Sequence, residues 1–133
     1  MNKIFMITEH NIDGIDASGN RAQWEINALK KKGFSNITLI DKFDETKVKE
    51  ISNGLVHAQQ LSGRFLHNTK YIVDTHGLEY DASSHLSRGY PVYSWKKWAF
   101  KAKSYHYKKL ENKIFRNSQH VICAGENIYE KVK

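Results

Sequence analysis

The chain has 133 residues, 40% of them hydrophobic, which is enough for one domain with a buried core but too few for two. Charged residues make up 26% and aromatic residues 12%, a balance that excludes a disordered tail. The net charge of +7 points to an anionic partner: nucleic acid, phospholipid or a phosphorylated small molecule. No apolar run is long enough to cross a bilayer and the first residues do not resemble a signal peptide, so we expect a cytoplasmic protein.

Short apolar runs alternate with helical patterns along the chain. The runs predict strands at residues 3–8, 37–40, 55–58, 71–74 and 120–124. The helical period predicts helices over residues 20–32, over about 20 residues from residue 95, and from residue 126, with short helical pieces or turns at 44–51 and 61–66. This alternation indicates one α/β domain over residues 1–133. We expect a Rossmann-like three-layer sandwich with a mainly parallel sheet, its first strand central and both faces covered.

Ligands of parallel α/β sheets lie beyond the carboxyl ends of the strands, so function is expected in residues 9–19, 57–60, 74–81 and 124–127. In the first of these segments, Asp16 to Arg21 opens a helix, where backbone N–H groups could face an anion. An ordinary strand-to-helix turn is the alternative. The chain contains neither G-x-G-x-x-G nor G-x-x-x-x-G-K-[ST], which argues against nicotinamide cofactors and P-loop nucleotide hydrolysis.

The densest group of reactive side chains runs from Asp74 to Glu79, directly after the fourth apolar run. His76 could transfer a proton near neutral pH, and Gly77 would let the backbone approach a ligand. A purely structural histidine is the alternative. Metal binding has less support because the seven histidines are scattered and no H-x-x-x-H or C-x-x-C occurs. The single cysteine, Cys123, excludes an internal disulfide and is expected to be a small core residue.

Residues 88–116 carry the positive charge of the chain. They hold nine Lys or Arg and one acid, Glu111, so this segment has a net charge of +8 and the rest of the chain −1. The segment also contains eight aromatic residues. Its expected core-facing stripe consists of Ala99, Ala102, His106, Leu110 and Ile114. The lysines and aromatic residues outside this stripe suggest contact with an anionic membrane or a phosphorylated acceptor. A solvated lysine face is the alternative. The expected contacts are Trp95, Lys96, Lys97, Trp98, Lys101 and Lys103.

The first predicted strand, its glycine-containing loop and the following helix, together with three later stretches in this order, resemble the N-terminal, acceptor-side domain of family 4 glycosyltransferases of GT-B fold. The later stretches are Gly54-Leu55-Val56-His57-Ala58-Gln59, Tyr71-Ile72-Val73-Asp74-Thr75-His76-Gly77-Leu78-Glu79, and the run from Leu110 to Glu126. The resemblance implies one half of a two-domain enzyme. The other half, the C-terminal domain that binds the nucleotide sugar through a Glu-x7-Glu motif, is absent from this chain and would act in cis or in trans.

The resemblance also implies roles for particular residues. His76 would be catalytic and lie against the transferred sugar, and donor or acceptor would contact Ser18, Gly19, Asn20, Arg21, Gln59, Gly77, Glu79 and Glu126. For Glu126, a role at the helix N-terminus is the alternative. The family pairs glycines where this chain has Ser18-Gly19. The enzyme would be a retaining, metal-independent transferase without a cofactor, and this half alone would be inactive.

The activity implied by the resemblance is transfer of a sugar from a nucleotide-sugar donor to a saccharide or lipid-linked acceptor in cell-surface glycan synthesis. The protein would be cytoplasmic or peripheral at the inner face of the cell membrane. A basic nucleic-acid-binding domain or a regulatory α/β domain is the alternative, although no nucleic-acid-binding signature occurs.

Overall fold

The computed structural model describes residues 3–11, 17–51 and 53–133, with only the backbone of residues 17–19. All five strands are parallel and form one sheet in the order β2-β1-β3-β4-β5. They are β1 (Ile4–Ile7), β2 (Ile37–Ile40), β3 (Leu55–Gln59), β4 (Tyr71–Thr75) and β5 (His120–Cys123). The predicted α/β class and parallel sheet are therefore confirmed. The prediction of a central first strand is wrong, because β3, β4 and β5 are all added on the same side of β1, which puts β3 in the middle.

The described part of the chain has four α-helices and two 3-10 helices, of which all but the last lie between strands. They are α1 (Ala17–Lys31), η1 (Glu45–Glu50), η2 (Gln60–Phe65), α2 (Glu79–Arg88), α3 (Trp95–Asn117) and α4 (Glu126–Val132). Helix α1 begins three residues before the predicted start. It ends with Lys30 and Lys31, and Gly33 follows with a φ of 92°, the left-handed conformation that glycine adopts without strain. Helix α2 lies in a segment for which no helix was predicted.

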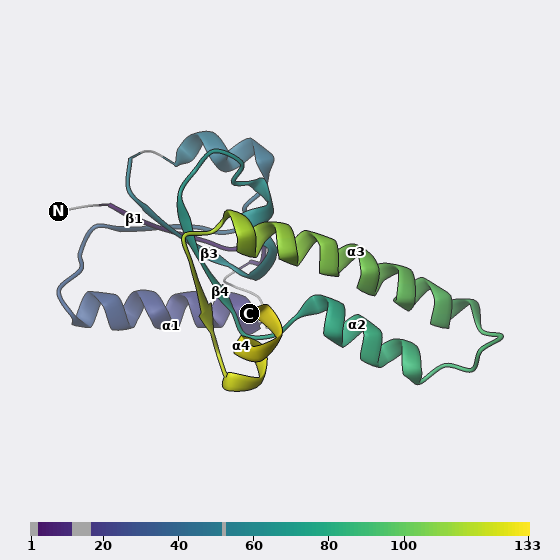
Figure 1. Ribbon diagram of the computed structural model, residues 1–133. Coiled ribbons are helices and arrows are strands. Elements are labelled where there is room, and N and C mark those ends of the chain that lie inside the picture. The colour runs from purple at the N-terminus through teal and green to yellow at the C-terminus, as the bar shows by residue number, and fades with distance from the viewer. Residues whose placement is uncertain (1–2, 12–16, 52) are drawn as a thin grey trace.

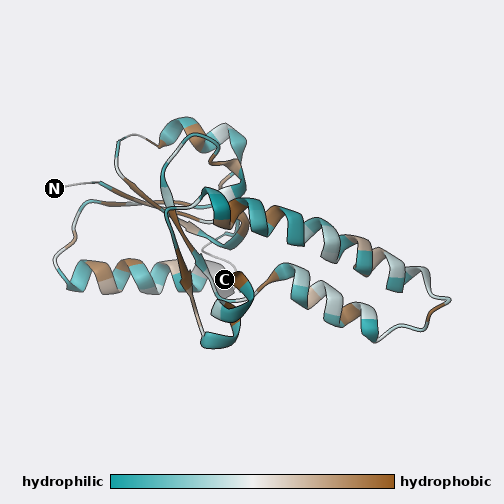
Figure 2. Cartoon of the chain, viewed as in Figure 1, coloured by the Kyte–Doolittle hydropathy of each residue, from teal (hydrophilic) through white to brown (hydrophobic). Residues whose placement is uncertain are grey.

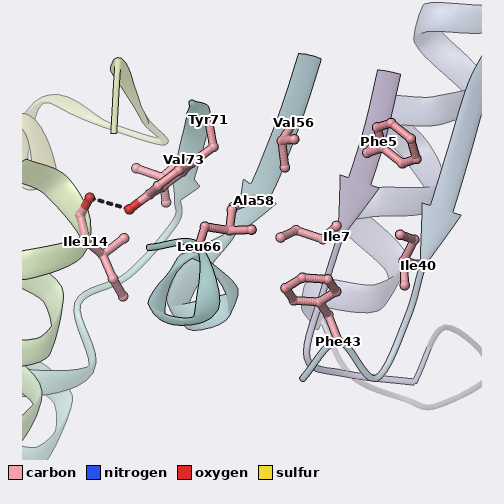
Figure 3. Packing of buried hydrophobic residues seen from close by; sticks show 10 residues of the cluster. All are labelled: Phe5, Ile7, Ile40, Phe43, Val56, Ala58, Leu66, Tyr71, Val73 and Ile114. Carbon is pink, nitrogen blue, oxygen red and sulfur yellow. Dashed lines mark hydrogen bonds between the residues drawn. The ribbon is translucent and has the colours of Figure 1, made fainter. Parts of the chain in front are cut away.

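One face of the sheet carries the main hydrophobic core (Figure 3). Side chains from four strands pack there against η2 and the C-terminal part of α3. Tyr71 on β4 is completely buried, and its hydroxyl donates a hydrogen bond of 2.8 Å to the carbonyl oxygen of Ile114 on α3. This bond and the burial of Ile114 fix the C-terminal part of α3 to the sheet.

The opposite face of the sheet is only partly covered. Met6 packs there against Ala22 and Ile26 of α1, which form a smaller core over β1 and β2. Ile122 on β5 keeps 44% of its surface exposed. The expectation that both faces are covered is therefore wrong for β5, because α1 lies over the other end of the sheet. Cys123 on the same strand is only partly buried.

Helices α2 and α3 form a hairpin that extends away from the sheet (Figure 1). The C-terminal end of α3 lies over the sheet, whereas its N-terminal half packs along α2 alone. Hydrophilic residues predominate along α3, in contrast to the strands (Figure 2). Among the described residues, no helix is both long and apolar enough to cross a membrane.

The predicted core-facing stripe of α3 is correct only at its C-terminal end. Leu110 is half-buried and Ile114 is buried, but Ala99, Ala102 and His106 are exposed. The inward positions of the N-terminal half are instead Phe100, Ser104 and Tyr107. The stripe is rotated because this half packs against α2, whose buried positions, Ser83 and Ser87, are small enough to accept larger side chains from α3.

Candidate functional site

A pocket of about 320 Å³ opens at the carboxyl edge of the sheet. Its walls come from the loop after β1, the end of β3, η2, and the neighbouring helices α2 and α3. This is the position at which parallel α/β sheets bind ligands, and the volume lies at the lower end of the range for small-molecule sites. The polar residues of the pocket are Glu9, His10, Gln59, Gln60, Arg64, Glu79 and Tyr107.

An ion pair forms one wall of this pocket. Nη2 of Arg64 lies 3.2 Å from Oε2 of Glu9. The other carboxylate oxygen, Oε1, and the Arg64 Nε are both buried, and neither has a hydrogen-bond partner among the described residues. Burial raises the pKa of Glu9, and the guanidinium of Arg64 opposes that rise. A buried polar atom without a partner is costly, and this pair holds one donor and one acceptor that the described residues leave unsatisfied.

His76 lies directly after β4, at the same edge of the sheet. Its Nδ1 is buried, and the part of the chain that the structure describes gives it no hydrogen-bond partner. Burial lowers its pKa, and the nearby positive charge of Arg21 lowers it further. The imidazole is therefore neutral at pH 7, a form in which one ring nitrogen donates and the other accepts a hydrogen bond.

The last residue of β4 stabilises the turn that follows His76. The Thr75 hydroxyl donates a hydrogen bond of 2.8 Å to the carbonyl oxygen of Gly77. A Cβ added to Gly77 would meet no atom of residues 3–11, 17–51 or 53–133 within 4 Å, so this glycine borders open space in the described structure. The backbone beside His76 can therefore be approached closely by a ligand.

Gln60 has a strained backbone at the point where β3 leads into η2. Its φ of 46° lies in the left-handed region, which costs a residue other than glycine about 1 kcal/mol or more. The Ser62 hydroxyl donates to the carbonyl oxygen of Gln59 at 2.6 Å and to that of Ile7 at 3.3 Å. The turn is thus fastened to β1 and β3, and the strained residue lines the pocket.

A polar network lies beside the pocket, between α1 and the sheet. Nε of Arg21 is 2.9 Å from Oδ2 of the buried Asp74, and its Nη2 is 3.2 Å from Oδ1. The same Nε is 3.1 Å from Oε1 of Glu25, whose other oxygen accepts a hydrogen bond of 2.8 Å from Gln59 Nε2. These bonds fix the end of β4, and with it the approach to His76.

The same network contains three groups of the kind that bind metal ions. Ligand atoms of Glu25, His57 and Asp74 lie within 4.8 Å of one another. The guanidinium of Arg21 already contacts both carboxylates and supplies the positive charge that an ion would otherwise provide. Burial, and then the neighbouring Asp74, raise the pKa of Glu25 to about 7, while burial lowers the pKa of His57. We interpret the group as an arginine-centred network.

The structure brings some of the predicted site residues together. Gln59 and Glu79 line the pocket, and His76 and Gly77 lie at the same edge of the sheet. Arg21 is adjacent but is bound to Asp74 and Glu25. These assignments stay predictions.

None of the other predicted site residues whose side chains the structure describes lines the pocket. Asn20 is exposed on α1, and Glu126 is exposed in the first turn of α4, which suits its alternative role at a helix N-terminus. For Ser18 and Gly19 the structure describes only the backbone, which belongs to α1. Trp95, Lys96, Lys97, Trp98, Lys101 and Lys103 lie at the far end of the hairpin.

Sequence reasoning missed several pocket residues. Glu9, His10 and Gln60 lie in segments that were expected to carry function, but no motif singled them out. Arg64 and Tyr107 come from η2 and α3. Only the packing of these elements against the strand ends brings the two side chains to the pocket, and no local pattern predicts that.

No protein-family model matches the chain, and no similar protein was found among curated proteins or solved structures. The site itself therefore has to carry any functional proposal.

Proposed function

We propose that this chain is the acceptor-binding domain of a GT-B glycosyltransferase that moves a sugar from a nucleotide-sugar donor to a saccharide or lipid-linked acceptor. Two observations support the proposal. The fold is a parallel, Rossmann-compatible α/β sheet, and a polar pocket lies at its carboxyl edge, the edge at which β4 leads into His76. The first observation alone would fit many functions, so the pocket carries the proposal.

The composition of the pocket favours a polyol over an anion. Sugar hydroxyls both donate and accept hydrogen bonds, so they need donors and acceptors side by side. The pocket lining offers both, since the amide of Gln60 and the hydroxyl of Tyr107 can each donate and accept. Two carboxylates, those of Glu9 and Glu79, line the pocket and would repel a phosphate. This mixture of donors and acceptors around one pocket at the carboxyl edge of the sheet is the observation that carries the proposal.

His76 would contact the transferred sugar in this proposal. A neutral imidazole can bind a hydroxyl without adding charge to the site, and the pKa of His76 is lowered by burial. Transfer also requires a donor held opposite the acceptor in a closed cleft, and positive groups that stabilise the leaving diphosphate. A second domain would supply these. We therefore expect the 133-residue chain alone to transfer no sugar.

Saccharide binding tests the proposal without requiring transfer. Backbone amide chemical shifts of the complete chain would be recorded while neutral oligosaccharides, nucleotide sugars and nucleotides are added in separate titrations. We expect a neutral saccharide to shift signals of residues 9–10, 59–64 and 76–79. His76→Ala and Arg64→Gln should each weaken that binding about tenfold, the effect of losing one or two good hydrogen bonds.

A matched control is His67→Ala. His67 is exposed and lies before β4, at the opposite end of the strand from His76, so its replacement should leave saccharide binding unchanged. Shifts confined to other parts of the chain, or equal losses in the His67 and His76 variants, would contradict the proposal.

A further inference from the structure

We propose that the far end of the α2–α3 hairpin docks on an anionic lipid bilayer. We call residues 89–103 the hairpin tip; they comprise the loop between the helices and the first turns of α3. This inference goes beyond the proposed function and does not depend on it, because it rests on a surface remote from the pocket.

The shape of the hairpin makes the tip available to a flat surface. Helix α2 has ten residues and is therefore about 15 Å long. It leaves the sheet after β4 and carries the connecting loop to the outer end of the molecule (Figure 1). A bilayer could contact the tip without meeting the sheet.

The tip exposes large apolar side chains. Val92 is 67% exposed, Tyr93 92%, Trp95 74% and Trp98 55%. The indole Nε1 of Trp98 donates a hydrogen bond of 2.9 Å to the carbonyl oxygen of Val92, which ties the loop to the first turns of α3. Such clusters are uncommon on monomeric proteins and usually mark interaction surfaces. Tryptophan and tyrosine are suited to the headgroup level of a membrane, since one end is apolar and the other polar.

The surface around this cluster is cationic. Within residues 88–116, Glu111 is the one acidic residue against nine Lys or Arg. The structure removes that acid from the surface: Glu111 is only 4% exposed, and its carboxylate accepts the backbone N–H groups of Glu79 and Tyr80 at 2.7 and 3.3 Å. The exposed side of this segment therefore carries no carboxylate. Positive charge beside aromatic side chains complements an anionic leaflet.

A hollow of about 350 Å³ lies on the tip, lined by Tyr90, Trp95, Lys96, Ala99, Phe100 and Lys103. The rings of Tyr90 and Phe100 stack with their centroids 5.7 Å apart and give it an aromatic wall. Lys96 and Lys103 are both exposed and line the hollow; Lys96 Nζ lies 5.8 Å from the centroid of the Tyr90 ring, and Lys103 Nζ lies 5.4 Å from that of Tyr107. Apolar surface next to two cations suits a phospholipid, whose phosphate would face the lysines.

Aliphatic side chains favour a bilayer over nucleic acid. Aromatic rings and lysines also bind single-stranded nucleic acid, because bases stack on the rings. Val92 on the tip and Leu86 near the end of α2, which is 52% exposed, offer no ring for stacking but gain from burial among lipids. We therefore commit to the lipid surface and leave nucleic acid as an outcome of the test.

Vesicle binding of the complete chain tests this proposal. Sedimentation would be measured with vesicles of phosphatidylserine and phosphatidylcholine in equal amounts, and with phosphatidylcholine vesicles alone. We expect binding to the anionic vesicles that weakens, without vanishing, as salt rises from about 0.01 M to about 0.15 M, because screening affects the lysines but not the aromatic side chains. In a Trp24→Phe background, both remaining tryptophans lie in the tip, and their emission should shift to the blue on binding.

Charge variants locate the surface. Replacing Lys96, Lys101 and Lys103 with glutamine should weaken binding about 100-fold, since each lysine near an anionic leaflet contributes about 1 kcal/mol. Lys97 is left in place because it is half-buried. The matched control replaces Lys30, Lys31 and Lys32, three exposed lysines at the end of α1, and should bind as the wild type does.

Trp95→Ala should weaken binding about fivefold, and Trp24→Ala, which removes an exposed tryptophan of α1, should not.

Circular dichroism would show that each variant is folded before binding is compared. Equal sedimentation with anionic and neutral vesicles would overturn the proposal, as would equal losses in the two triple variants. Binding to single-stranded DNA with no binding to anionic vesicles would replace it with a nucleic-acid surface.

Discussion

The sheet body and the hairpin bury their side chains in different ways. In the body, ten buried residues from strands, loop and helices form one continuous core. Along the hairpin, α2 contributes two buried serines, and the tip holds a stacked pair of partly buried aromatic rings. The large apolar residues of the tip remain exposed. The hairpin thus depends on its attachment to the body for its position, and its apolar side chains are available to a partner.

The largest loss of stability is expected from a substitution in the closely packed body. A Cβ on Gly54 would lie 2.4 Å from the carbonyl oxygen of Lys3, and backbone atoms there cannot move without breaking the start of the β1–β3 ladder. Gly54→Ala should therefore lower the free energy of unfolding by about 3 kcal/mol or more, measured by urea denaturation. Gly77→Ala is the matched control and should change stability by less than about 0.5 kcal/mol, because the space around it is open. Equal stability of the two variants would contradict this account of the packing.

The next largest loss of stability is expected where the hairpin is attached to the body. Ile114 is 2% exposed and packs in the body core, so Ile114→Ala should cost about 2–4 kcal/mol. Phe100 is larger but only partly buried near the tip, so Phe100→Ala should cost about 1 kcal/mol. Thermal denaturation of both variants checks the order. A greater loss for Phe100→Ala would mean that the hairpin has a stabilising core of its own.

Glu111 predicts a smaller, pH-dependent effect at the base of the hairpin. Burial raises its pKa to about 7, which outweighs the two backbone N–H groups that favour the ionised form. The folded state then binds a proton more tightly than the unfolded state, whose pKa is about 4.3. Stability should fall as pH rises from about 4.5 to about 7, and Glu111→Gln should reduce that fall by about 1–3 kcal/mol.

Urea midpoints of the wild type and of Glu111→Gln at several pH values in this range measure the effect. The stability of the variant should still depend on pH to some extent, because the pKa of Glu25 is also raised to about 7. Parallel curves for the two proteins would show that Glu111 does not titrate in this range.

The body was more predictable from sequence than the hairpin. Apolar runs such as Ile37 to Ile40 need only burial within a sheet, and this local requirement shows in the sequence. Helix α2 escaped prediction because its buried positions are serines, which produce no apolar period. The inward-facing residues of the N-terminal half of α3 were mispredicted for the same reason, because this half packs against the buried serines of α2. The candidate site was predicted in part: the strand ends located His76 and Gln59, but Arg64 and Tyr107 reach the pocket only through packing between elements distant in sequence.

The central claim is that the sheet body holds the ligand site and that the hairpin tip is the membrane-binding surface. Hydrogen–deuterium exchange of the complete chain, measured with and without anionic vesicles, tests this claim most directly. The account predicts slower exchange in peptides covering residues 89–95, whose amides lie in the loop and first residue of α3, with no change at residues 9–11, 59–64 and 76–79. Slower exchange at the pocket segments with none at the tip would contradict it.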